Sequence, residues 1–298
     1  MGENNLDFHE NRAAEAKLLG SRYGKARVRV ARVERGADGV QSLRELSVDV
    51  LVEGEFAASF LQGDNASVLP TDTMKNTLYV LAARHGIAGP EAFGTLAGCY
   101  FLERNPATHR VELTLRETRW ERLTVGGQPH PHGFRAPGFG TPMARVTVMR
   151  GAEPQVESGV DDLCLLKTTG SEFRGFLRDD LTTLPETDDR IFSTLLTGRW
   201  LWKAVPASYE EGNASAQEAM LAIFAREHSV SVQTTLFSMA RAALEGVPQI
   251  AQVTLQMPNR HYLPFDLTRF GLENTNTVFY PTDEPHGQIE ATVGRAGF

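Results

Sequence analysis

The sequence predicts an α+β fold in which antiparallel sheets carry helices on one face. Two observations support this prediction. Apolar residues recur first at every second position and then at helical spacing, so strands and helices are grouped along the chain. The order strand, strand, helix, helix, strand, strand occurs once in each half of the 298 residues, without obvious identity between the halves. The chain is therefore expected to consist of two similar halves.

The first half opens with a predicted hairpin. Ala26, Val28 and Val30 are expected to point inward because arginines stand between them. A turn at 36–39 leads to a second strand, in which the even-numbered residues of 46–52 are apolar. The other elements predicted here are a helix over 73–85 with Leu78, Leu81, Ala82 and His85 inward, a helix after Pro90, strands near 111–115 and 146–148, and a Gly/Pro-rich loop over 126–142.

The second half repeats this order. Ser215 and Glu218 have the spacing of a capping box, which predicts that a helix starts at Ser215. A second helix is expected from Val232 to Gly246. The predicted strands are 163–169, 191–205, 253–257, 278–280 and 289–293. A cluster of Gly and Pro at 152–160 suggests a boundary, giving an extension over 1–20, a first domain over 21–155 and a second over 156–298.

Composition argues against several classes of protein. Acidic residues exceed basic ones by 37 to 30, which gives a net charge of −7 and no general attraction for nucleic acid or an anionic membrane. No stretch approaches the roughly 20 apolar residues of a membrane span. Because we find neither a signal peptide nor a peroxisomal tail, a cytoplasmic location is expected. Cys99 and Cys164 are too few for a disulfide framework and are expected to be reduced thiols.

The run Thr71-Asp72-Thr73-Met74-Lys75-Asn76-Thr77 stands at a strand-to-helix turn. Backbone N–H groups at the start of a helix favour an anion, so this run is a candidate binding segment. Thr and Asp are also ordinary capping residues, and a well-capped helix explains the run equally well.

Phe173 and Arg190 form a second candidate pair. An exposed Phe offers a stacking surface for a planar ring, and Arg can bind a planar anion through two parallel hydrogen bonds. The alternative is a core Phe173 and a surface Arg190 that pairs with Asp188 or Asp189.

Two further candidates follow. The Val232 N–H and the Gln233 amide stand at a helix start, where they can face a ligand or simply begin the helix. Asn259 and His261 interrupt a strand and should point to the same side. An Asn beside a His can hold a small polar molecule and move a proton, although a single His is more often structural.

Metal and cofactor signatures are weak or missing. His130 and His132 are close in sequence, but no convincing third ligand stands nearby, so no metal is expected. The sequence contains no Walker A loop, dinucleotide fingerprint or Gly-x-Ser-x-Gly elbow. A flavin or nicotinamide cofactor is therefore not expected.

Together these segments resemble the urate oxidase (uricase) family of the tunnelling-fold superfamily, from about Tyr23 to Arg295. The residues that carry the resemblance are Ser21-Arg22-Tyr23-Gly24-Lys25, the run at 71–77, Phe173, Arg190, Val232-Gln233 and Asn259-x-His261. The resemblance implies tandem tunnelling-fold domains in a homotetramer around a tunnel-shaped barrel. It also implies cofactor-independent oxidation of urate by dioxygen and water to 5-hydroxyisourate and hydrogen peroxide. The segment before Tyr23 is longer than the family pattern, and we assign it no function.

The resemblance also implies roles for the substrate pocket. Phe173 would stack under the urate ring. Arg190 and Gln233 would bind its two edges, and the Val232 N–H and the region of Leu184 would complete the pocket.

The implied reaction centre adds further residues. Asn259 would hold dioxygen above the ring, and Lys25, Thr71 and His261 would form a proton relay. Thr71 and Asp72 would come from a neighbouring subunit, so the site would lie at a subunit interface.

Two other functions stay open. A tunnelling-fold enzyme that acts on a pterin would bind a similar flat ring, and several such enzymes need a zinc site. A non-catalytic purine-binding oligomer would bind urate without consuming oxygen. The presence of Lys25 and His261 argues against the second alternative.

Overall fold

The computed structural model describes residues 16–296, so residues 1–15 of the predicted extension and residues 297–298 lie outside the described range. The strands are β1 (Tyr23–Arg35), β2 (Gln41–Gly54), β3 (Thr108–Thr118), β4 (Glu121–Val125), β5 (Gln128–Arg135), β6 (Thr141–Met149), β7 (Gln155–Lys167), β8 (Phe192–Trp202), β9 (Ile250–Gln256), β10 (Asn259–Pro264), β11 (Phe279–Gly287) and β12 (Glu290–Gly294). The helices are α1 (Ala57–Gln62), α2 (Thr71–His85), α3 (Pro90–Arg104), α4 (Tyr209–Arg226) and α5 (Val232–Gly246), with a 3-10 turn η1 (Thr268–Phe270).

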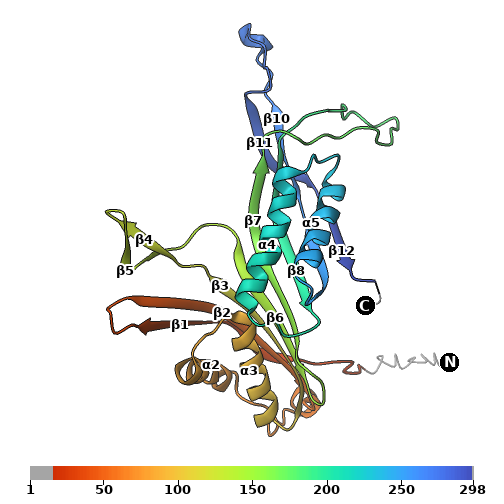
Figure 1. Ribbon diagram of the computed structural model, residues 1–298. Helices are drawn as coiled ribbons and strands as arrows, with labels where there is room; N and C mark the ends of the chain where they lie inside the picture. The colour runs from red at the N-terminus through yellow and green to blue at the C-terminus, as the bar shows by residue number, and fades with distance from the viewer. Residues whose placement is uncertain (1–15, 297–298) are drawn as a thin grey trace, which may run out of the picture.

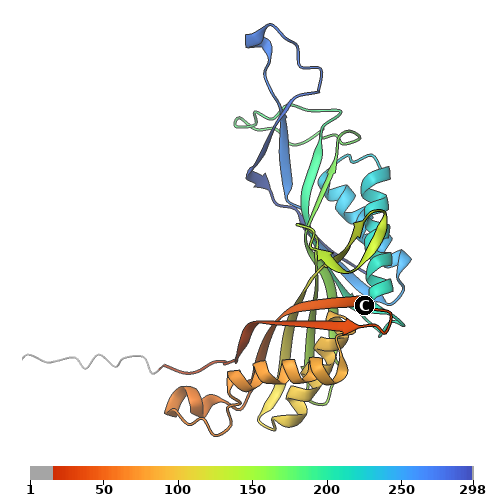
Figure 2. The same cartoon turned by 90° about the vertical axis from the view of Figure 1, so that its left-hand side faces the viewer.

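One antiparallel sheet runs through both halves of the molecule (Figure 1). Its strand order is β1-β2-β3-β6-β7-β8-β10-β11, and β9 pairs with both β8 and β12. Strands β4 and β5 form a separate hairpin. Helices α2 and α3 cover the sheet in the first half, and α4 and α5 cover it in the second (Figures 1 and 2). The predicted α+β class, with antiparallel strands and helices on one face, is confirmed.

The core lies between the sheet and the helices. Leu113, Leu115 and Val146 point to the helix-covered face and are fully buried. Gly94 lets α3 approach this surface closely, because a Cβ atom at Gly94 would lie 2.8 Å from side-chain atoms of Leu115 and Val146. A larger residue at Gly94 would therefore push α3 away from the sheet.

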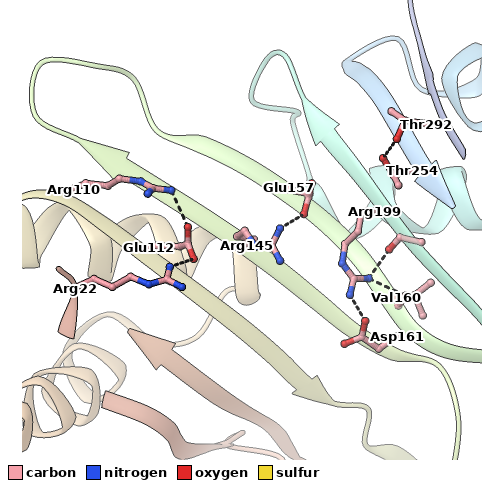
Figure 3. Close-up of polar contacts among 11 residues, drawn as sticks. Arg22, Arg110, Glu112, Arg145, Glu157, Val160, Asp161, Arg199, Thr254 and Thr292 are labelled. Carbon is pink, nitrogen blue, oxygen red and sulfur yellow. Dashed lines mark hydrogen bonds and ion pairs between the residues drawn. The ribbon is translucent and has the colours of Figure 1, made fainter. Parts of the chain in front are cut away.

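The opposite face of the sheet is polar, and many of its charged side chains are paired (Figure 3). The contacts drawn there include Arg110–Glu112, Arg22–Glu112, Arg145–Glu157, Arg199–Asp161 and Thr254–Thr292. Successive residues of a strand point to opposite faces, so the same strands supply an apolar core and this charged surface. Within residues 16–296, every helix is too short or too polar to cross a membrane.

Strands β6 and β7 join the two halves, and Val146 of β6 lies opposite Val156 of β7. Strand β7 begins at Gln155, earlier than the predicted start at 163, so the proposed boundary falls at the beginning of a strand. The halves contribute the orders β1-β2-β3-β6 and β7-β8-β9-β12 to one continuous sheet. The division into two domains stays a prediction.

A buried carboxylate also connects the halves. Glu91 of α3 is 2% exposed and accepts hydrogen bonds from Ser158 Oγ at 2.5 Å and Asn213 Nδ2 at 2.8 Å. The indole N–H of Trp202 donates to Ser158, and that of Trp200 donates to Asn213. This network links α3 of the first half to β7, β8 and α4 of the second, and each of its members has a hydrogen-bond partner.

Strand β1 departs from the predicted alternation. Lys25 pairs with Val50, whereas Val28 pairs with Val48, so β1 holds one extra residue and forms a β-bulge. Val28 is buried as predicted, but Ala26 is exposed. The inward prediction for Ala26 was wrong because the bulge reverses which residues face the core.

Helix α4 begins earlier than predicted. Its N-cap is Ser208, whose side chain accepts a hydrogen bond from the Glu211 N–H at 3.2 Å. Ser215 is an exposed residue within this helix, so the predicted capping box at Ser215 was wrong. The predicted loop over 126–142 also needs correction, since it contains strand β5.

Helix α2 begins at Thr71, two residues before the predicted start. Its N-cap is Pro70, and the cap position makes no side-chain hydrogen bond. Thr71, Asp72 and Thr73 therefore belong to the first turn and do not precede the helix as predicted. His85 is exposed, so its predicted place on the inward face was wrong.

Candidate active site

A cavity of about 430 Å³ lies between the start of α5, strand β10 and the segment that precedes β8. Its lining includes Phe173, Leu184, Arg190, Val232, Gln233, Asn259 and His261. These residues are dispersed over the second half of the sequence, and the fold gathers them on one surface. The site predicted from that half of the chain therefore forms a single hollow.

Phe173 stands in the cavity wall on a short ladder. Its N–H donates to the Thr187 carbonyl at 2.9 Å, and the Thr187 N–H donates back at 3.1 Å. Phe176 stacks on Phe173 with ring centres 5.0 Å apart, which supports the aromatic surface. The guanidinium carbon of Arg190 lies 5.3 Å from the centre of the Phe173 ring. Phe173 is half-buried and lines the cavity, so it is not the core residue of the alternative interpretation.

Arg190 is half-buried, and its buried Nε lacks a hydrogen-bond partner in the described chain. Burial lowers the pKa of Arg190, because a buried cation loses its hydration. Asp188 pairs with Arg174 at 2.6 Å, and Asp189 accepts hydrogen bonds from Thr169 at 2.9 Å. The alternative of a surface Arg190 paired with Asp188 or Asp189 is therefore wrong. The site presents a partly desolvated cation to the cavity.

Helix α5 places its first turn against the cavity. Ser231 is the N-cap, and its side chain accepts a hydrogen bond from the Thr234 N–H at 3.1 Å. Val232 is buried, whereas Gln233 is exposed, and both line the cavity. The first N–H groups of a helix have no partner within the helix, so the Val232 N–H can donate to a ligand.

Strand β10 carries Asn259 and His261, and both line the cavity. Asn259 lies opposite Thr194 of β8, which ties it to the rigid centre of the sheet. Burial lowers the pKa of His261, and the positive charges of Arg190 and His286 lower it further. His261 therefore stays neutral to a lower pH than an exposed histidine and can accept a proton at neutral pH.

The remaining predicted residues form a second group. Lys25 of β1 is near the start of α2, which carries Thr71 and Asp72, and its charge acts on the Asp72 carboxylate. The pKa of Asp72 is lowered, chiefly by Lys75 at 2.5 Å and also by Asn76 and Lys25. Asp72 is thus held as a carboxylate beside two lysines.

The two groups lie far apart in one chain. Lys25, Thr71 and Asp72 do not line the cavity. The elements that carry them, β1 and α2, lie at the opposite end of the molecule from β10 (Figures 1 and 2). The structure of a single chain therefore brings seven of the ten predicted residues together and leaves these three apart.

Sequence reasoning missed several residues of the cavity wall. Phe279 and Ile289 line it from the end of the chain, and the Ile289 carbonyl accepts a hydrogen bond from the Met257 N–H at 2.8 Å. No local pattern distinguishes these apolar residues from ordinary strand positions. Phe176 does not line the cavity but stacks on Phe173, and it could have been suspected because it stands three residues after Phe173 in a polar segment.

The two histidines considered as metal ligands lie on β5, outside the cavity. The rings of His130 and His132 meet edge to face with centres 4.6 Å apart. Residues 16–296 contain no group of three or more His, Cys, Asp or Glu placed to hold a metal ion.

Comparison with known proteins identifies the family. The family model described as Uricase matches residues 21–147 and 156–290. The uricase of Dictyostelium discoideum is 41% identical over 283 residues, which cover 94% of this chain and 98% of that protein. The uricase of Arthrobacter globiformis is 38% identical over 277 residues, covering 93% and 89%. A crystal structure of uricase from Arthrobacter globiformis matches with a TM-score of 0.90 at 36% identity, covering 96% of this chain and 97% of that chain. With its family match and its gathered cavity residues, the chain belongs to the uricase family of enzymes.

Proposed function

We propose that the chain is a urate oxidase that needs no metal or organic cofactor. It would convert urate, dioxygen and water into 5-hydroxyisourate and hydrogen peroxide. The observation that carries the proposal is the cavity in which a half-buried cation, an amide and a helix start surround a stacking phenylalanine. Membership of the uricase family supports urate as the substrate.

The cavity suits a flat anion. Arg190 would donate two parallel hydrogen bonds to one edge of urate, and the anion would compensate a guanidinium that burial leaves short of partners. Gln233 would bind the other edge, with the Val232 N–H as a further donor. Phe173 would stack under the ring, and Leu184 would help to close the pocket.

The chemistry asks the protein mainly to bind, orient and move protons. Dioxygen accepts electrons singly, and urate that has lost a proton is electron-rich enough to supply them. Transfer of two electrons in steps and bond formation at C5 would give a hydroperoxide. This adduct would release hydrogen peroxide and add water to form 5-hydroxyisourate. Asn259 would hold dioxygen and then water above the ring, and His261 would exchange protons with Thr71 and Lys25.

A second chain is needed for that relay. We propose a homotetramer around a tunnel, in which Lys25, Thr71 and Asp72 of one subunit complete the cavity of another. The position of these residues at the far end of their own chain supports this arrangement. The paired charges on the helix-free face of the sheet (Figure 3) also suit a surface that lines a water-filled tunnel.

The test is oxygen uptake by metal-stripped protein with urate, while the ultraviolet absorbance of urate is followed. We expect equal consumption of oxygen and urate with formation of peroxide, and no loss of activity with chelators. Inhibition that added metal reverses would contradict cofactor independence and point to His130 and His132. Binding of urate without oxygen uptake would favour a binding protein, and turnover of a pterin instead of urate would favour the other tunnelling-fold activity.

A further inference from the structure

The β-bulge in β1 decides the direction in which Lys25 points. Val48 and Val50 are two residues apart in β2, whereas their partners Val28 and Lys25 are three apart in β1. Directly opposed residues of antiparallel strands share a face, so Lys25 lies on the face of the buried Val50. In a regular strand Lys25 and Val28 would point to opposite faces. The extra residue therefore turns Lys25 to the helix-covered face, where α2 begins with Thr71.

The bulge depends on an unfavourable backbone conformation. Arg27 has φ of +56°, in the left-handed region that residues other than Gly, Asn and Asp rarely adopt. Its N–H donates to Asp49 Oδ1 of β2 at 2.6 Å. A hydrogen bond to a carboxylate is stronger than one between neutral groups, so it can hold this conformation. In the bulge of β7 the left-handed residue is Asp162, a residue type that tolerates the conformation better.

We propose that Asp49 is a positioning residue for catalysis. Its carboxylate holds Arg27 in the left-handed conformation and so maintains the bulge that directs Lys25 to the α2 face. This inference rests on the proposed function, in which Lys25 belongs to the proton relay. Asp49 itself does not line the cavity, so it acts through the backbone of β1.

A second contact orients the Asp49 carboxylate. Arg116 Nη1 lies 3.7 Å from Asp49 Oδ2, and Arg116 Nε lies 3.1 Å from Asp161 Oδ2. Asp49 thus presents one oxygen to the Arg27 N–H and the other to a guanidinium. An asparagine at position 49 would keep an acceptor oxygen but lose the charge, so it should retain part of the effect.

The experiment compares turnover and urate binding in variants of the full chain. We expect Asp49→Ala to lower kcat about tenfold, which is the effect of ~1.4 kcal/mol, and to leave KM for urate within about twofold. Asp49→Asn should fall between Asp49→Ala and the parent protein. An unchanged kcat in Asp49→Ala would overturn the inference.

A second substitution separates positioning from general damage. Glycine adopts the left-handed conformation without strain, so Arg27→Gly added to Asp49→Ala should restore kcat to within about twofold of the parent. Failure of this rescue in a folded double variant would also overturn the inference. If Asp49→Ala does not fold, Asp49→Asn with and without Arg27→Gly provides the same comparison.

Glu53→Ala is the matched control. Glu53 lies on the same strand and face as Asp49, with a side chain 30% exposed against 34%, and it is paired with Arg110 at 2.7 Å. It makes no contact with the bulge, so Glu53→Ala should leave kcat within about twofold even if it lowers the melting temperature. An equal loss of kcat in Glu53→Ala would show that loss of any ion pair on β2 lowers turnover, and this result would contradict the inference.

Lys25→Met distinguishes failure of the proposed proton relay from failure of the proposed role of Asp49. Full activity of Lys25→Met would contradict the proposed relay, and Asp49 would then have no catalytic residue to position. An inactive Lys25→Met beside a fully active Asp49→Ala would leave the relay intact and contradict the role of Asp49.

Discussion

At the scale of single residues, Arg190 has two effects on the cavity. Its guanidinium is the natural partner of an anionic ligand, since the buried Nε has no partner in the described chain. The same charge, after burial, lowers the pKa of His261. A proton acceptor and an anion-binding group are therefore coupled: the residue that would attract urate also keeps the neighbouring imidazole neutral.

The pH dependence of turnover tests this coupling. If His261 must be neutral to accept a proton, kcat should fall at acid pH only below the ordinary pKa of histidine, because its pKa is lowered. Arg190→Gln removes a positive charge, so the pKa of His261 should rise and the acid limb should move to higher pH. Urate binding should weaken by about 1.5–3 kcal/mol through loss of a charged donor. Kinetics over a series of pH values measure both effects.

His286→Gln is the control for this prediction. His286 also lowers the pKa of His261, as the smallest of the three causes, but it does not line the cavity. We expect a smaller shift of the acid limb in the same direction, with urate affinity unchanged. An acid limb that stays in place or moves to lower pH in Arg190→Gln would show that His261 is not the group that titrates.

At the scale of secondary structure, α4 offers two possible starts with the same local pattern. Ser208 and Ser215 are each followed three residues later by a glutamate. The helix starts after Ser208, where tertiary contacts select it. Tyr209 meets the Trp202 ring edge to face at 5.4 Å, and Asn213 donates to the buried Glu91 at 2.8 Å. Residues 209–214 are thus helical because they contact Trp202 of β8 and Glu91 of the first half.

Substitution of the two serines should give opposite results. Ser208→Ala removes the N-cap hydrogen bond and should lower the free energy of unfolding by about 1 kcal/mol. Ser215→Ala replaces an exposed residue within the helix with a better helix former and should be neutral or raise stability by a few tenths of a kcal/mol. Thermal or denaturant unfolding measures both. A larger loss in Ser215→Ala would contradict the observed helix start.

The elements show what sequence can and cannot predict. Alternation identified most strands, although not β4, β5 or β10, and helical spacing identified α2, α3 and α5, because each buries one face against the sheet. The bulge after Lys25 escaped prediction, since Ala26 and Arg27 carry no local sign of a left-handed residue and the stabilising carboxylate is on another strand. The start of α4 escaped for a similar reason, because distant Glu91 and Trp202 decide it.

At the scale of the whole molecule, the residues proposed for the site fall into two groups. The cavity with Phe173 and Arg190 belongs to one end of the chain, and Lys25 with Thr71 belongs to the other (Figures 1 and 2). Residue types alone predicted a binding segment at 71–77 and residues in the second half that could bind a ligand or move a proton, whereas Lys25 was suggested only by the resemblance. Only the resemblance to the uricase family suggested that they act together, because no pattern in one sequence encodes contacts between copies.

Mixing of impaired variants, assayed at a urate concentration too low to saturate Arg190→Gln, tests the proposed shared site. In a mixed pair of Thr71→Ala and Arg190→Gln subunits, one site carries both changes and the other carries neither. About a quarter of the sites in the co-assembled chains should therefore be unaltered. The activity of the mixture should be about a quarter of the parent's and well above the summed activities of the two variants assayed alone. Lys25→Met mixed with Thr71→Ala is the control without recovery, because both changes fall in the same group. Equal recovery in both mixtures would contradict a site divided between subunits.

Backbone hydrogen bonds join neighbouring strands from β1 through β2, β3, β6 and β7 to β8 without a gap. Between β1 and β8 the described chain therefore has no hinge with which to fold Lys25 onto its own cavity. In the proposed assembly, turnover would therefore require association of chains as well as folding. On dilution, separated chains would keep their secondary structure and lose turnover, and the inactivation rate would report how fast the partners dissociate.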